Sequence, residues 1–205
     1  MQGEHQHLDF KFEINDARKI ARSFVAFANS EGGKLLIGVK DNGSVAGVRT
    51  EEEHYMIEAA ASYYCLPPVP YSVRKWELEG KTVLEVDIPE GKDKPYLVKL
   101  KEETPKAYVR IADENIRASH IQVMAWKKQK YPSGLLIDDA ENQSRLLHYM
   151  ETLQPVSLNM VCKTLMLTRK KAEHLLADMV YLNVLDILYQ DDKVLFRIKN
   201  KPDVF

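Results

Sequence analysis

The segment SFVAFANSEGGKLLIGVKDNGSVAG, from Ser23 to Gly47, limits the possible folds of this 205-residue chain more than any other stretch. Its first half has the apolar periodicity of a packed helix, and Gly32 and Gly33 should end that helix because glycine is common just past a helix C-terminus. The apolar run KLLIGVK then predicts a strand, and Asp-Asn-Gly at 41–43 predicts a tight turn into a second strand, SVAGVR. A helix followed directly by a hairpin indicates a mixed α+β fold.

The residues on either side of this segment extend the α+β pattern over a first domain of residues 1–130. HLDFKFEI alternates apolar and polar residues, so we expect a half-buried strand with Asp9 and Lys11 on its polar face. A helix capped by Asn15 or Asp16 should follow this strand. The further elements expected in chain order are a helix over 51–65, strands over 71–78, 81–88, 95–100 and 106–111, and a helix over 114–129.

A second, smaller domain is predicted over residues 135–205. KYPSG at 130–134 has the composition of a linker, because proline and glycine interrupt the helical pattern. Three short helices are expected over 140–153, 157–165 and 169–183, and a hairpin with its turn at Asp191-Asp192 should follow them. Three helices and a two-stranded wing are the element order of a winged helix-turn-helix domain.

Gly32, Gly33 and Lys34 raise the question of a phosphate-binding loop. A Walker loop places its glycines and lysine between a strand and a following helix, whose N-terminal N–H groups surround the phosphates. Here the glycines close a helix and open a strand, and Leu35 stands where a hydroxyl residue should follow the lysine. We therefore do not expect ATP to be a cofactor.

The composition is typical of a soluble protein with a packed core. Hydrophobic residues make up 45% of the chain, and its formal net charge of −1 gives no global basic field. Cys65 and Cys162 are far apart, which suits a reducing compartment. MQGEHQHLDF lacks the features of a signal peptide, and no apolar run approaches the roughly 18 residues that span a bilayer. We expect a cytoplasmic protein without a membrane partner.

Four stretches within residues 4–120 resemble the Schlafen-type AlbA_2 domain. They are LDFKFE, FVAFANSEGGKLLIGVKDNGSVAGV, DKPYLVK and AYVRIADENIRAS, which follow that family's EFK, AFANTxGGxLxIGVxDxGxxxG, kPY and YxRxGS patterns in order. The resemblance implies an Alba-like α+β fold that binds nucleic acid. Bacterial members often carry a C-terminal helix-turn-helix and are described as DNA-binding transcriptional regulators. The chain departs from the pattern at Asp9, in place of glutamate, and at Ile111-Ala112-Asp113, in place of a glycine and a serine.

The resemblance also implies a second possible function, because Schlafen proteins that cut RNA use three acidic residues. Transferred by position, these are Glu4, Asp9 and Asp41. Three converging carboxylates can hold Mg²⁺ or Mn²⁺ and activate a water for attack on a phosphodiester bond. The ordinary alternatives are a frayed N-terminus for Glu4, the solvent side of a strand for Asp9 and a tight turn for Asp41. Odd spacing also places Glu4 and Asp9 on opposite strand faces unless the chain bends between them.

Basic side chains are candidates for contacts with DNA or RNA in both domains. In the first domain they are Lys11, Arg110 (the arginine of the YxR pattern) and Arg117, with Arg18, Arg22, Lys34 and Lys40 scattered nearby. In the second domain Arg169, Lys170 and Lys171 begin the third helix, at the end that enters the major groove in helix-turn-helix proteins, and Lys193 and Arg197 flank the wing. The alternative for each of them is ordinary solvent exposure.

Three functions are compatible with these features. Binding of DNA or RNA, as a transcriptional regulator, is the leading one, and by analogy the protein should be a homodimer. The others are a metal-dependent endoribonuclease, so whether the protein is an enzyme stays open, and a protein-interaction module. Residues 135–205 hold nine Lys and Arg against ten Asp and Glu, whereas most DNA-binding modules are clearly basic.

Overall fold

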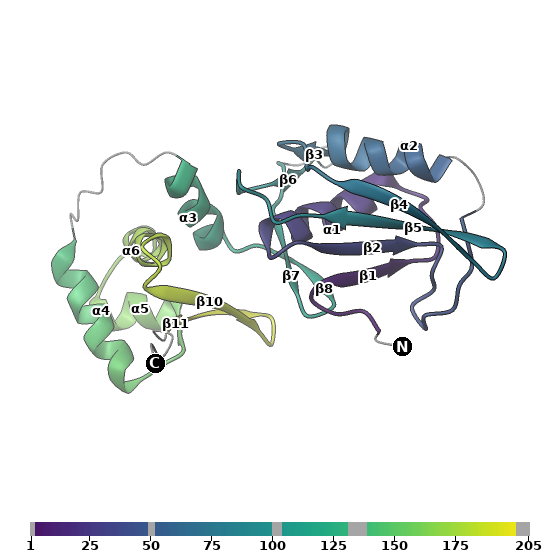
Figure 1. Ribbon diagram of the computed structural model, residues 1–205. Coiled ribbons are helices and arrows are strands. Elements are labelled where there is room, and N and C mark those ends of the chain that lie inside the picture. The colour runs from purple at the N-terminus through teal and green to yellow at the C-terminus, as the bar shows by residue number, and fades with distance from the viewer. Residues whose placement is uncertain (1–2, 49–51, 100–103, 131–138, 200–205) are drawn as a thin grey trace, which may run out of the picture. The chain divides into compact units, whose positions relative to one another are not determined.

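The computed structural model describes residues 3–48, 52–99, 104–130 and 139–199, and it divides the chain into two compact units (Figure 1). The first unit is Met1–Ala118 and the second is Ser119–Phe205. The helix after Ala118 therefore belongs to the second unit, although the sequence placed it in a first domain that ends at 130. Apart from its first residue, the linker expected at 130–134 lies outside the described residues. Within the described ranges, no helix is long and apolar enough to cross a membrane.

A four-stranded mixed sheet is the centre of the first unit. Its strand order is β1-β2-β5-β4, in which β1 and β2 are parallel and the other neighbours are antiparallel. Helix α1 connects the two parallel strands and packs across one face of the sheet (Figure 1). The bounds of these elements are β1 Leu8–Lys11, α1 Ala17–Asn29, β2 Gly33–Ile37, β4 Ser72–Leu78 and β5 Lys81–Ile88.

Smaller elements complete the first unit. Helix α2 continues directly into a π-helical segment, η1, and two short antiparallel pairs, β3 with β6 and β7 with β8, flank the main sheet. Their bounds are α2 Glu52–Glu58, η1 Ala59–Tyr64, β3 Cys65–Leu66, β6 Leu97–Val98, β7 Tyr108–Ile111 and β8 Glu114–Arg117.

Two local expectations for the first unit were wrong in detail. The helix expected over 114–129 begins only at His120, because Ala112 adopts a φ of 53° and turns the chain from β7 directly into β8. The turn at 41–43 is present, with Gly43 N donating to Lys40 O at 2.7 Å. The strand SVAGVR expected after it is reduced to a single bridge between Val39 and Val45.

Helix α1 begins and ends as the sequence predicts. The side chain of Asp16 caps it by accepting a hydrogen bond from Arg18 N at 2.9 Å. After the last turn, Gly32 N donates to Phe27 O at 3.0 Å. Gly32 has a φ of +76°, and a Cβ on it would lie 2.8 Å from Ile88 O. Both the backbone conformation and the close approach to β5 therefore require glycine at this position.

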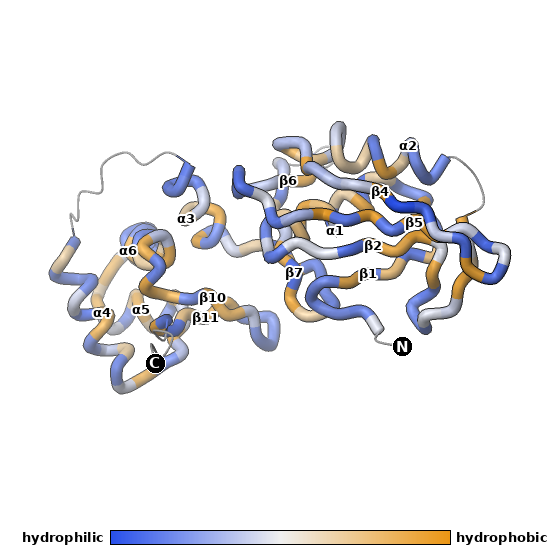
Figure 2. The backbone as a smooth tube through the Cα atoms, in the orientation of Figure 1, coloured by the Kyte–Doolittle hydropathy of each residue, from blue (hydrophilic) through white to orange (hydrophobic). Residues whose placement is uncertain are grey.

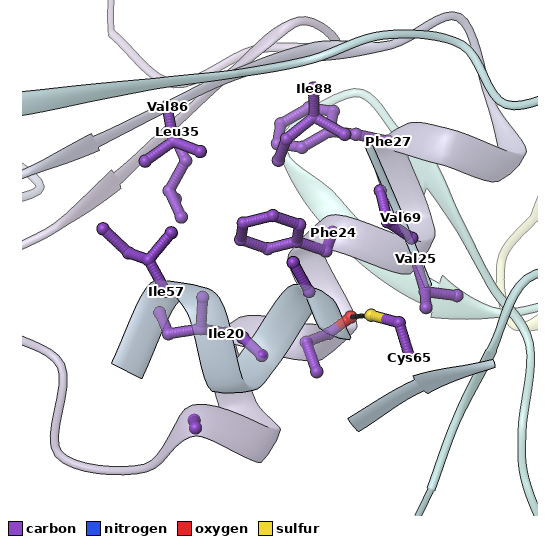
Figure 3. Packing of buried hydrophobic residues seen from close by; sticks show 14 of the residues in the cluster. Ile20, Phe24, Val25, Phe27, Leu35, Ile57, Cys65, Val69, Val86 and Ile88 are labelled. Carbon is purple, nitrogen blue, oxygen red and sulfur yellow. Dashed lines mark hydrogen bonds between the residues drawn. The ribbon is translucent and has the colours of Figure 1, made fainter. Parts of the chain in front are cut away.

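The main hydrophobic core lies between α1 and the sheet. Phe24 and Phe27 of α1 pack with Leu35 of β2 in one cluster of buried side chains (Figure 3). The Cys65 thiol is part of this cluster, and its Sγ lies 3.8 Å from Ala21 O, the contact drawn as a dashed line in Figure 3. Burial raises the pKa of Cys65 to about 12, so the thiol stays protonated at neutral pH.

Strand β1 is covered on both faces, and the expectation that its polar face meets solvent was wrong. Phe10 packs with Val39 and Val83 in a small separate cluster on one side. Asp9 points to the opposite side, toward α1, and is only 2% exposed. The polar face of β1 is therefore turned inward, where Ser23 of α1 meets it.

The second unit joins helices to a small antiparallel sheet of order β10-β11-β9. Leu146, Met150, Leu176 and Phe196 are fully buried in its core, and Ile121 connects α3 to the same cluster. The expected order of three helices and a hairpin is found, and Figure 2 shows the hydrophilic turn between β10 and β11. The bounds are α3 His120–Lys130, α4 Ala140–Thr152, β9 Val156–Ser157, α5 Leu158–Leu165, α6 Arg169–Tyr181, β10 Leu185–Gln190 and β11 Lys193–Ile198.

Candidate nucleic-acid interface

Glu4 and Asp9 lie together because the chain bends just before β1. His5 N and Leu8 O, and likewise Leu8 N and His5 O, are 3.0 Å apart, and this tight turn reverses the N-terminal residues. Glu4 Oε1 consequently reaches Phe10 N and accepts its hydrogen bond at 2.8 Å. Burial, a hydrogen bond with Asp9 and the charge of Asp9 raise the pKa of Glu4 above its usual value. The bend that the odd spacing required is therefore present.

Two hydrogen-bond donors and a nearby guanidinium surround the carboxylate of Asp9. Ser23 Oγ donates to its Oδ2 at 2.9 Å, and Lys11 Nζ donates to its Oδ1 at 2.8 Å. Arg110 Nη2 is 3.7 Å from the same Oδ1. Burial alone would raise the pKa of Asp9, but hydrogen bonds from Glu4 and Lys11 and the charges of Lys11 and Arg110 outweigh it and lower that pKa. Asp9 is therefore a buried carboxylate that stays ionised.

Arg110 is a structural residue, and its assignment as a phosphate contact was wrong. Its side chain is 1% exposed because the alternation of β7 points it inward. Nη2 donates to Leu8 O at 3.1 Å, Nη1 donates to Asn115 Oδ1 at 3.1 Å, and Cζ lies 5.2 Å from the centre of the Phe27 ring. The guanidinium thus joins β7, β8 and β1 below the surface. Nucleic acid cannot reach it in this arrangement.

The other basic candidates of the first unit differ in accessibility. Lys11 is partly exposed, but its Nζ is engaged by Asp9 and by Phe10 O, the latter at 2.7 Å. Arg117 is exposed on β8 and pairs across the hairpin with Tyr108. Of the three first-domain residues singled out, Arg117 therefore has the freest side chain.

Asp41 is separate from the acidic pair. It lies in the exposed turn after β2, whereas Asp9 is opposite Leu35 in the middle of the sheet. Among the residues that the structure describes, no three His, Cys, Asp or Glu side chains gather in a group that could hold a metal ion. Glu4, Asp9 and Asp41 do not form the expected three-carboxylate site, and Asp9 is already occupied by protein donors.

The second unit contains a helix, a short turn and a second helix, followed by a hairpin. Helix α5 ends where Met166 adopts a left-handed conformation with φ 53°, and Leu167 N donates to Cys162 O at 3.0 Å. Thr168 caps α6, its Oγ1 accepting from Lys171 N at 3.4 Å. Two helices joined by a turn of three to four residues have the element order of a helix-turn-helix motif. The N-terminus of α6 is consequently exposed and well defined.

All five basic candidates of the second unit are exposed. Lys170 and Lys171 follow Arg169, whose Nε donates to Glu173 Oε1 at 3.0 Å. A cavity of about 470 Å³ lies at the starts of α3, α5, α6 and β11, and Arg169 and Lys193 are among the residues that line it. Arg197 Nε is 3.7 Å from Asp186 on the neighbouring strand.

Sequence reasoning missed two residues of the buried polar network. Ser23 donates to Asp9, and Asn115 connects Ser23 to Arg110, its Nδ2 donating to Ser23 Oγ at 3.0 Å. Ser23 had a detectable signal, because it is a polar residue that begins a long apolar stretch of α1. Asn115 had no such signal, because its role depends on the β7–β8 hairpin, and the sequence predicted a helix from residue 114 onward.

Comparison with known proteins identifies weak structural likenesses and one family. The DIP2311 protein from Corynebacterium diphtheriae is 18% identical, with a TM-score of 0.48 over 63% of this chain and 25% of that one, so the match spans a quarter of its length. The N-terminal domain of a RecG-related protein from Nitrosomonas europaea is 24% identical, with a TM-score of 0.39 over 57% of this chain and 85% of that domain. The search of curated proteins gave no match.

The family model described as Schlafen, AlbA_2 matches residues 4–119. This range covers more than half of the chain and coincides with the first unit, including the bend at Glu4, the α1–β2 segment and the β7–β8 hairpin. The resemblance in the sequence motifs is thereby confirmed, and the chain belongs to the Schlafen AlbA_2 family.

Proposed function

We propose that this protein binds nucleic acid and that its second unit is a winged helix-turn-helix that binds duplex DNA. The observation that carries the proposal is the exposed N-terminus of α6, where Arg169, Lys170 and Lys171 follow the cap at Thr168. The partial positive charge of the helix N-terminus adds to these three cations. In helix-turn-helix proteins this end of the second helix enters the major groove.

The hairpin supports the same mode of binding. Lys193 begins β11, next to the β10–β11 turn, and Arg197 lies further along the same strand. Contacts of such side chains with phosphates fix the position of a protein on the duplex without reading the sequence. The proposed role is therefore that of a transcriptional regulator that occupies a DNA site.

A homodimer is part of this proposal. Two-fold related copies of α6 would contact two half-sites separated by one turn of the duplex, about 34 Å. Light scattering should then give about twice the 23.6 kDa mass of one chain. A mass of one chain at micromolar concentration would rule out the dimer. The proposal that α6 binds duplex DNA would then apply to a monomer.

Fluorescence anisotropy with a labelled duplex, repeated over a range of salt concentrations, tests the binding mode. Replacing Arg169, Lys170 and Lys171 by alanine should flatten the slope of log affinity against log salt by about 2–3 units, because each lost phosphate contact removes about 0.9. A matched control variant replaces the exposed Lys127, Lys130 and Arg145 by alanine, which changes the net charge equally at other positions of the unit.

The control variant should keep the slope of the unchanged protein. If the α6 variant has the same slope of log affinity against log salt as the control variant, α6 does not contact phosphates. The second unit would then be assigned to protein interaction instead. An apolar protein interface depends little on salt, so the two functions separate clearly in this measurement.

A further inference from the structure

The exposed surface of α1 is entirely cationic. Ten of the 13 residues of this helix are buried, and the remaining ones are Arg18, Lys19 and Arg22. Arg22 follows Lys19 by three residues and Arg18 by four, and both spacings make side chains neighbours on a helix surface, so the three charges form one cluster. An exposed helix face of a globular protein normally mixes both signs of charge. This one contains no acidic residue.

Tyrosine rings border these cations. Arg18 Cζ lies 5.1 Å from the centre of the Tyr64 ring, and Arg22 Cζ lies 5.8 Å from that of Tyr108. Tyr63, which is 65% exposed, lies edge-on to Tyr64 with ring centres 5.0 Å apart. Lys99 Nζ is 5.2 Å from the Tyr63 ring. Cations and tyrosine rings are therefore neighbours on this surface.

The segments that supply these side chains are neighbours in the fold. Lys99 N donates to Tyr64 O at 2.8 Å, which joins the end of β6 to η1, and η1 packs on α1. On the other side of α1, β7 places Tyr108 opposite Arg117 of β8. We call the continuous patch the α1 surface; its cations are Arg18, Lys19, Arg22, Lys99 and Arg117.

The five cations of the α1 surface have no ion-pair partner among the residues that the structure describes. Elsewhere in the first unit, Lys34 is 3.0 Å from Glu85 and Lys94 is 2.7 Å from Glu90. Positive charge without a described carboxylate partner is thus concentrated around Tyr63, the exposed tyrosine of this surface, whereas Tyr64 and Tyr108 are partly buried against the core.

We infer that the α1 surface binds single-stranded nucleic acid. Unpaired cations attract a phosphate backbone, and the exposed ring of Tyr63 can stack on the face of a base, which only an unpaired strand can offer. Duplex DNA presents phosphates but keeps its bases stacked, so it would leave Tyr63 without a partner. The inference deepens the proposed nucleic-acid binding and shares with it only the class of ligand, because its residues belong to the first unit and α6 belongs to the second.

The test uses the full chain and labelled strands of about 16 nucleotides, oligo-dT and oligo-rU, with a duplex of equal length as the comparison. Replacing Arg18, Lys19 and Arg22 together by alanine should flatten the salt dependence for single strands by about 2 units, at about 0.7 per contact. The control variant replaces Arg74, Lys75 and Lys92, which are exposed elsewhere in the first unit, and should leave the slope unchanged. Circular dichroism checks that each variant is folded.

Tyr63 separates stacking from charge. Tyr63→Ala should weaken single-strand binding about tenfold without changing the salt slope, since stacking of one base on an aromatic ring contributes on this scale. Tyr63→Phe keeps the ring and should retain affinity. If the hydroxyl of Tyr63 were needed instead of its ring, Tyr63→Phe would lose as much affinity as Tyr63→Ala.

The outcomes distinguish this inference from the proposed function. If the α6 variant loses duplex binding and keeps single-strand binding, both proposals stand, and if the chain binds single strands but no duplex, the inference stands alone. An unchanged slope in the α1 variant would overturn the inference. Equal displacement by polyglutamate would overturn it too, because a surface that accepts any polyanion has no preference for bases. DNA and RNA strands are compared in the same assay.

Discussion

Asp9 organises the polar interior of the first unit, because side chains from three elements meet at its carboxylate. Lys11 comes from β1, Ser23 from α1 and Arg110 from β7. The side chains of Arg110 and Asp9 are both almost completely buried, so the charge of each one compensates the other for the loss of hydration. Removal of one partner from a buried ion pair leaves an uncompensated charge, which costs more than the pair itself contributes.

Asp9→Ala should therefore lower the free energy of unfolding of the first unit by about 3–5 kcal/mol. The chain has two tryptophans, Trp76 in the first unit and Trp126 in the second. Urea unfolding followed by fluorescence in a Trp126→Phe background thus reports the first unit alone. Asp93→Ala, which removes an exposed carboxylate, is the control and should change little. An unchanged midpoint in Asp9→Ala would show that Asp9 is retained for a role other than stability.

Glu4 gives a pH dependence of defined sign. Its pKa is raised above the ordinary 4.5, so the folded state holds this proton more tightly than the unfolded chain. The contribution to stability is present at low pH and is lost as the pH rises through the raised value. Glu4→Gln, neutral at every pH, should therefore be more stable than the unchanged protein at pH 7.

The advantage of Glu4→Gln should disappear as the pH falls toward 4.5, where Glu4 itself becomes neutral in the folded protein. Urea midpoints measured above that pH keep Asp9 out of the comparison, since its lowered pKa makes its stabilisation disappear only below 3.8. A constant difference between the two proteins at all pH values would contradict the assignment to Glu4 ionisation.

At the scale of elements, the junction between α1 and β2 is the most constrained part of the first unit. Gly32 there combines a positive φ with backbone atoms of β5 at 2.8 Å from the position of a Cβ. Gly80, in the turn between β4 and β5, has a similar φ of +71° but no atom within 4 Å of that position. An alanine at Gly80 would therefore carry backbone strain alone, whereas an alanine at Gly32 would carry the same strain and a steric clash.

Gly32→Ala should cost more stability than Gly80→Ala. Both variants carry the strain of a left-handed residue, on the order of 1–3 kcal/mol, and Gly32→Ala adds a clash with backbone that cannot move freely. Urea unfolding monitored by Trp76 measures both, provided that the signal of the Gly80 variant is calibrated separately because Trp76 lies on the adjoining strand. Equal losses would show that β5 yields to the added methyl group.

Local signals explain which elements the sequence predicted. Helix α1 and strand β2 follow from apolar periodicity and from the glycines between them, and the starts of α5 and α6 follow from caps at Ser157 and Thr168. Strand β8 was missed because its pairing depends on the left-handed turn at Ala112, where an alanine gives no warning of such a conformation. The burial of Asp9 depends on α1 and β7 packing over β1, which strand alternation alone does not specify.

The sequence alone predicts the cations of α1 but not the tyrosines beside them. Arg18, Lys19 and Arg22 are the charged residues between 17 and 29, so a helix buried along most of its length had to expose these positions. The tyrosines beside them could not have been placed, because η1, β6 and β7 approach α1 only in the folded unit. Arg110 shows the reverse case, since a motif arginine that resembled a surface contact is buried.

At the scale of the whole molecule, each unit has its own core and its own candidate surface. The first unit carries the α1 surface and the second carries α6. If both surfaces bind nucleic acid as proposed, they raise each other's effective concentration when both can be occupied at once. The natural ligand of such a chain would contain paired and unpaired nucleotides in one molecule.

A duplex with a single-stranded tail should therefore bind about 10²-fold more tightly than the blunt duplex or the free strand alone. Anisotropy with the three ligands at equal salt measures the gain. The gain should vanish in the Arg18, Lys19 and Arg22 variant and also in the α6 variant. A tail that adds nothing to the unchanged protein would contradict simultaneous use of the two surfaces.

The burial of Cys65 makes the second cysteine a natural attachment point. With a pKa of about 12 and its Sγ directed at Ala21 O, the Cys65 thiol should resist alkylation in the folded protein. Cys162 is partly exposed on α5, which packs against α6. A maleimide dye should therefore label the unchanged chain at one position, Cys162, beside α6. The fluorescence of that dye should then change when a ligand binds at α6.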